Sequence, residues 1–173
     1  QWGDEGKGRI IDYLAQEVLA NLPAPRLTFL LESSILTTLN ADLCDAVCSP
    51  SAGEASNSAA QLRQLVQDNL FIAEIDEQDG WYRYHPQFQS CLRKQLHLAR
   101  PPAAIKQLYA RAAGWYGAHG YVSESMLAYL AADLPARAAD QLEWSLADLY
   151  RREQMQLLHH LVGLLPPALV AAR

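Results

Sequence analysis

One block of the sequence limits the possible folds more than any other, because it changes from a strand pattern to a helix pattern within a few residues. The aromatic run Trp81-Tyr82-Arg83-Tyr84 follows an acidic turn directly. An amphipathic segment comes next, in which Phe88, Leu92 and Leu96 recur at i, i+4 and i+8. The block therefore predicts the second strand of a β-hairpin that continues into a helix with one apolar face.

His85 lies where this predicted strand meets the predicted helix. The first turn of a helix exposes backbone N–H groups that favour a nearby anion, so a histidine here is suited to contact a phosphate. The alternative is a structural role, in which the imidazole packs against Trp81 or Tyr84 and holds the hairpin in place. The residue pattern alone leaves both interpretations open.

Before this block, hydrophobic periodicity predicts three helices. The first covers about residues 9–22 and stops at Pro23. The second follows it and carries Leu27, Leu30, Leu31, Ile35 and Leu36. The third is the short segment Leu43–Val47, with Asn40 or Asp42 as its N-cap.

A loop, a further helix and a first strand complete this part of the chain. Ser49–Ser58 is rich in small and turn-forming residues and is expected to be a loop without a packing role. Ala60–Asp68 predicts a helix, and Leu70–Ile75 predicts the first strand of the hairpin. Helices followed by a two-stranded hairpin are the architecture of a winged helix, which we predict for residues 1–100. The net charge of −5, and a single arginine in the helix before the hairpin, argue against a DNA-binding surface here.

Residues 101–173 show only helical patterns. The predicted helices begin near Pro102, Ser123, Pro135 and Met155, the last ending at Pro166-Pro167, and Gly120 marks a turn. Short antiparallel helices rich in Ala and Leu are typical of a TPR-like helical-repeat array, which needs several repeats for stability. We therefore expect this chain to be part of a longer protein; a small helical bundle is the alternative. The predicted fold is mainly α: a winged helix with a two-stranded β-hairpin, followed by TPR-like antiparallel helical repeats.

The composition argues against several other classes of protein, namely membrane, secreted and zinc-binding proteins. No apolar run is long enough to span a bilayer, and the polar, Gly-rich N-terminus does not resemble a secretory signal, so we expect a cytoplasmic protein without membrane contact. The three cysteines include no CxxC pair. Cys44 and Cys48 could share a helix face, but no further ligands complete a zinc site. We therefore predict small buried thiols and no metal site.

A separate signal lies at the N-terminus. Residues 1–12 closely resemble the phosphate-binding loop of adenylosuccinate synthetase. Gly6 and Gly8 would let backbone N–H groups approach a phosphate, and Lys7 would add positive charge. The resemblance implies that Asp4 acts as a base on the nucleotide. It supports an alternative function, a nucleotide-binding enzyme of the synthetase type, although it covers only a dozen residues and nothing later in the chain resembles that enzyme.

A longer series of motifs extends over about residues 9–170. In order these are Ile11-Asp12-Tyr13-Leu14, Glu17-Val18-Leu19, Phe29-Leu30-Leu31, Ser34-Ile35-Leu36, Leu43-Cys44-Asp45-Ala46-Val47, Asn69-Leu70-Phe71-Ile72, Trp81-Tyr82-Arg83-Tyr84-His85, Phe88, Leu92-Arg93, Arg111-Ala112-Ala113, Trp115-Tyr116, Gly120 and Ala131-Ala132-Asp133. With this order and spacing the chain resembles the large ATP-dependent transcriptional regulators of the LuxR type, the maltose-regulator-like members of the STAND ATPase class. The resemblance covers their winged helix and first helical repeats.

In that family an ATPase domain, a winged helix, inducer-sensing repeats and a DNA-binding helix-turn-helix follow one another. The resemblance implies that this chain is the central regulatory fragment, which couples inducer sensing to the nucleotide switch in signal transduction and is not itself an enzyme. Its partners would be the ATPase domain of the same full-length chain and a small-molecule or protein inducer bound by the repeats. DNA would be contacted only through a C-terminal domain that this sequence lacks.

The resemblance also assigns a role to His85, which would contact the β-phosphate of bound ADP from the winged helix in the full-length protein. The fragment contains no Walker-type phosphate loop, so no cofactor is expected in it, and ATP or ADP belongs to the full-length protein. Pro86 departs from the family pattern, because members often carry a second His or an Asp there. Proline suits the first turn of a helix but offers no polar side-chain contact.

Overall fold

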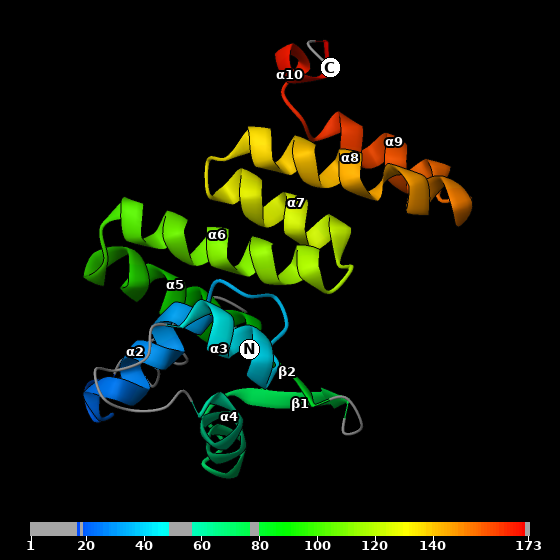
Figure 1. Ribbon diagram of the computed structural model, residues 1–173. Helices are drawn as coiled ribbons and strands as arrows, with labels where there is room; N and C mark the ends of the chain where they lie inside the picture. The colour runs from blue at the N-terminus through cyan, green and yellow to red at the C-terminus, as the bar shows by residue number, and fades with distance from the viewer. Residues whose placement is uncertain (1–16, 18, 49–56, 77–79, 172–173) are drawn as a thin grey trace, which may run out of the picture. The chain divides into compact units, whose positions relative to one another are not determined.

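The computed structural model describes residue 17 and residues 19–48, 57–76 and 80–171. The chain divides into two compact units, one that ends at Ile105 and one that begins at Lys106. Most of the described residues are helical, and the sheet among them has two strands (Figure 1). The prediction of a mainly α fold with one two-stranded hairpin is therefore confirmed. Of the helix predicted over residues 9–22, residues 17 and 19–22 are described. Residues 17, 19 and 20 are helical, and residues 21 and 22 form a turn before Pro23.

The helices described in the first unit share a buried core. α2 (Ala24–Ser33), α3 (Ala41–Val47) and α4 (Ser58–Gln67) precede the hairpin, and α5 (Pro86–Ala99) follows it. α2 packs against α5, and α3 packs against α4. The side chains that they bury almost completely include Leu30, Leu43, Leu62, Phe88, Leu92 and Leu96. The last three of these form the apolar helix face that the periodicity predicted.

Side-chain caps determine where α3 and α4 begin. The Oδ1 atom of Asn40 accepts the backbone N–H three residues later at 2.8 Å, so Asn40 rather than Asp42 is the N-cap of α3. Asn57 caps α4 in the same way at 3.2 Å. Ser58 is therefore a buried residue of the first turn of α4, and the prediction that the loop extends through Ser58 without packing is wrong there. Residues 49–56 of that predicted loop lie outside the described residues.

α2 ends earlier than the periodicity predicts. Ile35 and Leu36 were expected to belong to it, but the helix ends at Ser33. Gln89 and Arg93 of α5 donate hydrogen bonds of 2.5–3.0 Å to the three carbonyl groups that follow Ser33. These side chains satisfy carbonyl groups of the segment that follows the helix, which no regular secondary structure pairs. The tertiary contact with α5 therefore stabilises the exit from α2, while Ile35 and Leu36 remain buried.

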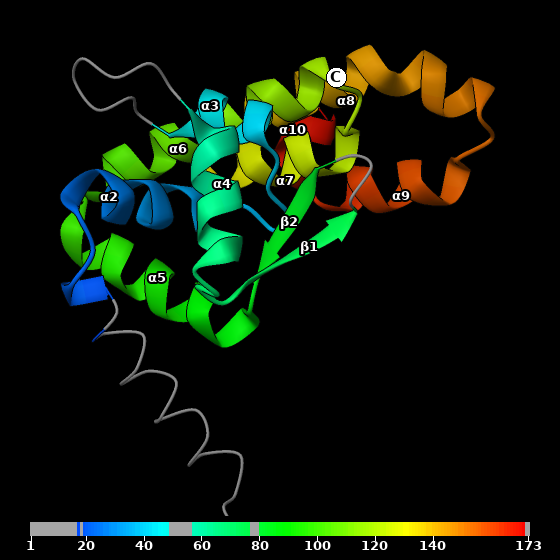
Figure 2. The same ribbon diagram turned by 90° about the horizontal axis from the view of Figure 1, so that it is seen from below.

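The hairpin consists of β1 (Ile72–Asp76) and β2 (Trp81–Tyr84), which pair antiparallel as predicted. The first residue of β1 lies opposite the last residue of β2, and a bulge shifts the register near the end of β1. Figure 2 shows the two strands side by side. The other edge of β2 is also paired, because Leu39 and Tyr82 exchange two backbone hydrogen bonds of 2.8 Å. The periodicity did not predict this pairing with a residue far back in the chain.

A tight turn, and not an early strand, links α4 to β1. Asn69 has a φ of 52°, and the backbone N–H of Leu70 donates to the carbonyl of Leu65 at 3.0 Å. This is a Schellman motif, and the burial of both leucines is the hydrophobic feature that usually accompanies it. Leu70 therefore completes the end of the helix. The predicted strand start at Leu70 is wrong, since β1 begins at Ile72.

The second unit consists of helices joined by short turns. They are α6 (Pro102–Ala118), which enters it from the first unit, α7 (Val122–Ala131), α8 (Pro135–Arg151), α9 (Met155–Gly163) and α10 (Pro167–Ala171). α8 packs against α7, α9 and α10. The buried core contains Met126, Ala138, Ala139, Leu142, Leu149, Leu161 and Leu165. The sequence pattern placed the last helix end at Pro166-Pro167, but Pro167 begins α10, because proline lacks an N–H that the first helical position does not need.

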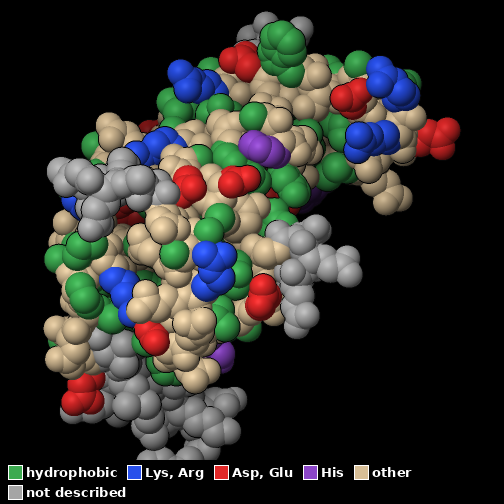
Figure 3. Space-filling model, turned by 60° about the horizontal axis from the view of Figure 1, so that its bottom comes forward, with side chains coloured by type: hydrophobic (Ala, Val, Ile, Leu, Met, Phe, Trp, Pro, Cys, Tyr) green, Lys and Arg blue, Asp and Glu red, His purple; other side chains and the backbone are tan. Residues whose placement is uncertain are grey.

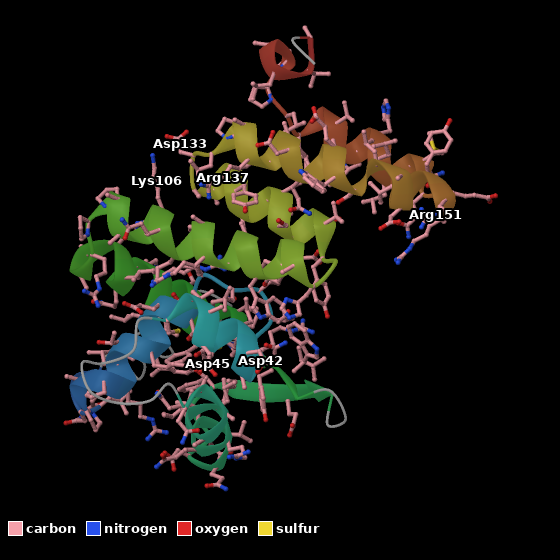
Figure 4. All side chains as sticks on the ribbon, in the orientation of Figure 1. Asp42, Asp45, Lys106, Asp133, Arg137 and Arg151 are labelled. Atoms are coloured by element: carbon pink, nitrogen blue, oxygen red, sulfur yellow. The ribbon has the colours of Figure 1, made fainter. Side chains whose placement is uncertain are left out.

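The three turns between α6 and α9 each contain one residue in the left-handed region. Gly120 has a φ of 79°, Asp133 of 61° and Glu153 of 56°. After each of them, the next backbone N–H bonds to the carbonyl five residues back at 2.9–3.0 Å, the pattern of a Schellman motif. The prediction of a turn at Gly120 is confirmed. Asp133 also pairs with Lys106 at 2.7 Å, and Figure 4 shows these two side chains facing each other.

Candidate functional site

The candidate site is the junction between β2 and α5, where His85 occupies the N-cap position of the helix. Its backbone N–H donates to the carbonyl of Phe71 at 2.7 Å, and its carbonyl accepts the N–H of Gln89 at 2.9 Å. The first contact attaches the junction to the start of β1, and the second begins the hydrogen bonding of α5. Pro86 fills the next position, as its fixed φ favours. The backbone on both sides of His85 is therefore held in place.

The side chain of His85 is exposed. Within the described part of the chain, the imidazole forms no hydrogen bond, ion pair or aromatic contact with another side chain. The packing against Trp81 or Tyr84 that the structural interpretation required is not among its contacts. An exposed imidazole on a fixed backbone can accept or donate a hydrogen bond to a ligand or to another domain.

His85 shares an open groove of about 540 Å³ with the outer surface of the hairpin. The groove is lined by Phe71, Ile72, Ala73, Glu74, Ile75, Arg83, Tyr84, His85 and Pro86. Arg83 and His85 are two residues apart in an extended segment, so their side chains leave on the same side of the backbone. Arg83 is exposed as well. The groove therefore combines a largely apolar lining with three polar groups, the Arg83 guanidinium, the His85 imidazole and the Glu74 carboxylate.

Tyr84 lies between these two residues but points into the core. It is 1% exposed, and its hydroxyl is 2.8 Å from the Oγ atom of Ser33 in α2. Its ring meets Phe88 edge-on at a centroid distance of 6.0 Å. Burial raises the pKa of the Tyr84 phenol well above its usual value, although the hydrogen bond with Ser33 opposes the shift. Tyr84 thus anchors the strand end, so that Arg83 and His85 face outward.

Phe71 also belongs to this site, although the motif that contains it did not predict a role there. It has a φ of 51°, which is unusual for a residue other than glycine and costs conformational energy. The strained conformation lets its carbonyl accept the N–H of His85 while its ring lies 5.1 Å from that of Phe88. No local sequence signal marks such a position, because the two contacts come from residues that follow the hairpin.

The other predicted site residues are not brought to this groove. Asp4, Gly6, Lys7 and Gly8 of the phosphate-loop alternative lie outside the described residues, so that prediction stays a prediction. The cysteines at 44, 48 and 91 are buried and uncrosslinked, as predicted, and burial raises the pKa of the Cys44 thiol. Within the described ranges, no group of three or more His, Cys, Asp or Glu side chains is placed to hold a metal ion. No helix in those ranges is long and apolar enough to cross a membrane.

Charge does not concentrate on α4, the helix that precedes the hairpin. Arg63 is its one basic residue. On the face shown in Figure 3, basic and acidic side chains are interspersed. A nucleic-acid surface usually needs clustered positive charge, so neither α4 nor this face has the charge pattern of a DNA-binding surface.

The helices, the hairpin and the junction at His85 together define a winged helix followed by antiparallel helices. Residues 15–105 match the MalT winged helix domain, and the chain belongs to this family. The match covers α2 to α5 and the hairpin, so the winged-helix prediction is confirmed, as is the resemblance to maltose-regulator-like proteins.

Two kinds of curated relatives extend the similarity beyond the winged helix. The chain is 33% identical over 157 residues to the HTH-type transcriptional regulator MalT of Klebsiella pneumoniae, which covers 90% of this chain and 16% of that protein. It is 29% identical over 164 residues to the serine/threonine-protein kinase PknK of Mycobacterium tuberculosis, covering 95% of this chain and 14% of the kinase. The chain thus spans about one seventh of the length of these relatives.

Proposed function

We propose that this chain is the central regulatory segment of an ATP-dependent transcriptional regulator of the LuxR type. In this proposal the winged helix contacts the ATPase domain of the same full-length chain, of the STAND class, and the TPR-like helices transmit the binding of an inducer. The segment itself catalyses no reaction and acts in the cytoplasm. The observation that supports the proposal best is the family match over residues 15–105, with an exposed histidine at the start of α5.

The proposed role of His85 is to contact the β-phosphate of ADP and so to stabilise the closed, resting state. A side chain that binds a phosphate in only one of two states adds free energy to that state alone. The exposed imidazole, its fixed backbone and the neighbouring Arg83 support such a contact. ADP and ATP are cofactors of the full-length protein in this proposal, and DNA is contacted by a different domain.

The test is the variant His85→Ala in the full-length regulator. A hydrogen bond to a charged group contributes about 1.5–3 kcal/mol, so its loss should shift the closed-to-open equilibrium by roughly tenfold to a hundredfold. We expect higher basal reporter transcription without inducer. His97→Ala is the matched control, because His97 is exposed in the last turn of the same helix. A lower melting temperature for His85→Ala with unchanged basal transcription would contradict the proposal and favour a structural role.

A further inference from the structure

The second unit contains a cleft of about 420 Å³ that the proposed role of His85 does not involve. At its floor, the side chain of Gln141 in α8 lies next to Gly117 in α6. A Cβ atom at Gly117 would lie 2.5 Å from the Oε1 atom of Gln141, so the glycine lets the Gln141 side chain lie directly against α6. Ser145, one turn further along α8, is buried and donates to the carbonyl of Gln141 at 2.9 Å. The floor is therefore polar and fixed.

One stripe of α8 forms a wall of the cleft. Gln141, Trp144, Ser145, Asp148 and Leu149 line it, and Arg152 follows at the helix end. These residues are three or four positions apart and therefore lie on one face of the helix. The facing wall comes from the turn at Gly120 and the first turn of α7, which contributes Glu124.

Trp144 is the most exposed large hydrophobic side chain among the described residues, at 86%. Its indole has no aromatic or hydrogen-bond contact with another described residue. Exposed tryptophan is costly in water, and tryptophan at the edge of a cleft is the residue most typical of binding hot spots. A free indole face also attracts cations through its quadrupole.

The charged groups of the cleft differ in whether they already have a partner. Asp148 is already paired with Arg151 at 2.9 Å, whereas Glu124 has no ion pair within the described part of the chain. Arg152 lies eight residues beyond Trp144, which is about 12 Å along a helix. The cleft is therefore lined by a carboxylate without an ion pair, an exposed aromatic face and, where α8 ends, a cation.

We propose that this cleft binds a peptide segment that carries a lysine or arginine side chain. The cationic group would lie over the Trp144 ring with Glu124 as its counter-charge, and Arg152 would bind a carbonyl or carboxylate further along the peptide. Charge complementarity favours this occupant over an anionic one, because the aromatic face and the unpaired carboxylate both attract positive charge. The proposal concerns the second unit and does not depend on the role of His85.

The test compares two tetrapeptides, acetyl-Gly-Arg-Gly-Gly amide and its citrulline analogue, which has nearly the same shape without the charge. Binding to the 173-residue chain is followed by the NMR signal of the Trp144 indole N–H, which the Trp144→Ala variant assigns among the four tryptophans. We expect the arginine peptide to bind at least about fivefold more tightly than the citrulline peptide, and this preference to weaken at high salt.

Variants of the chain identify the side chains that bind the arginine peptide. Trp144→Ala and Glu124→Gln should each weaken binding of the arginine peptide by about fivefold to tenfold, while Trp144→Phe should keep most of the affinity. Tyr150→Ala is the matched control, since Tyr150 is a 68% exposed aromatic residue of α8 outside the cleft, and it should leave binding unchanged. Equal affinity for both peptides, unchanged binding by Trp144→Ala, or no binding of the arginine peptide at about 10 mM would each overturn the proposal.

Discussion

Neighbouring residues at the end of β2 have opposite environments, and this alternation creates the candidate site. Tyr84 is buried against Ser33 and Phe88, while Arg83 and His85 are exposed. Successive side chains of a strand point to opposite faces, so anchoring one of them determines the direction of the two beside it. The buried phenol therefore contributes to stability and also orients the groups proposed to contact the phosphate.

The Tyr84→Phe variant should separate the hydrogen bond of this anchor from its packing. At pH 7 the variant should lose about 1 kcal/mol of unfolding free energy, the usual net value of one hydrogen bond, because Ser33 keeps its 2.7 Å bond to the carbonyl of Phe29. The folded-state pKa of Tyr84 is raised above its unfolded value. Its stabilising effect is thus complete below pH 10 and decreases by about 1.4 kcal/mol per pH unit above it.

Urea unfolding of the wild type and of Tyr84→Phe at pH 7 and pH 11 measures both effects. The stability difference between the two proteins should nearly disappear at pH 11, since only the wild type loses this phenol's contribution. Tyr150→Phe, at an exposed position of α8, should match the wild type at both pH values. If the stability difference between Tyr84→Phe and the wild type is the same at both pH values, the Tyr84 phenol does not cause the loss of stability at high pH.

Among the helices, strands and turns, the features that depend on residues close together in the sequence could be predicted. The features that depend on residues far apart in the sequence could not. The apolar face of α5 and the strand–turn–strand pattern are local, so periodicity located both. The left-handed residues Asp133 and Glu153 have no comparable signal, because aspartate adopts that conformation only occasionally and glutamate rarely, whereas glycine does so readily. The pairing of Leu39 with β2 depends on residues more than 40 positions apart, and the local pattern does not contain it.

A substitution to glycine should have opposite effects on the unfolding free energy in the left-handed turn between α8 and α9 and within α8 itself. Glu153→Gly should raise the unfolding free energy by about 0.5–1 kcal/mol, because glycine adopts a positive φ without a Cβ penalty at the end of a helix. Ala147→Gly, at an exposed position inside α8 and four residues before its last residue, should lower the unfolding free energy by about 1 kcal/mol. Thermal unfolding followed by circular dichroism compares the two variants directly. Destabilisation by both would mean that Glu153 makes contacts that outweigh its backbone strain.

In the molecule as a whole, each of the two units carries one of the two proposed binding sites. The winged helix of the first unit carries the groove with His85 and Arg83, and the second unit carries the cleft beside Trp144. Each site lies within one unit, so each can be tested without assuming how the units are placed. The relatives are about seven times longer than this chain, and a proposed switch function therefore involves groups that other segments supply.

This division leads to a prediction about nucleotides. The chain alone should show no measurable affinity for ATP or GTP and no adenylosuccinate synthetase activity. Phosphate sites depend on several preorganised donors. The groove offers the side chains of Arg83 and His85 in an open, solvent-accessible setting, with the Glu74 carboxylate in the same lining, and screening makes single contacts weak there. Isothermal titration calorimetry with ATP and GTP, together with a synthetase assay, tests this. Micromolar GTP binding that disappears in Lys7→Ala but persists in His85→Ala would contradict the prediction and favour the enzyme alternative based on the N-terminal loop.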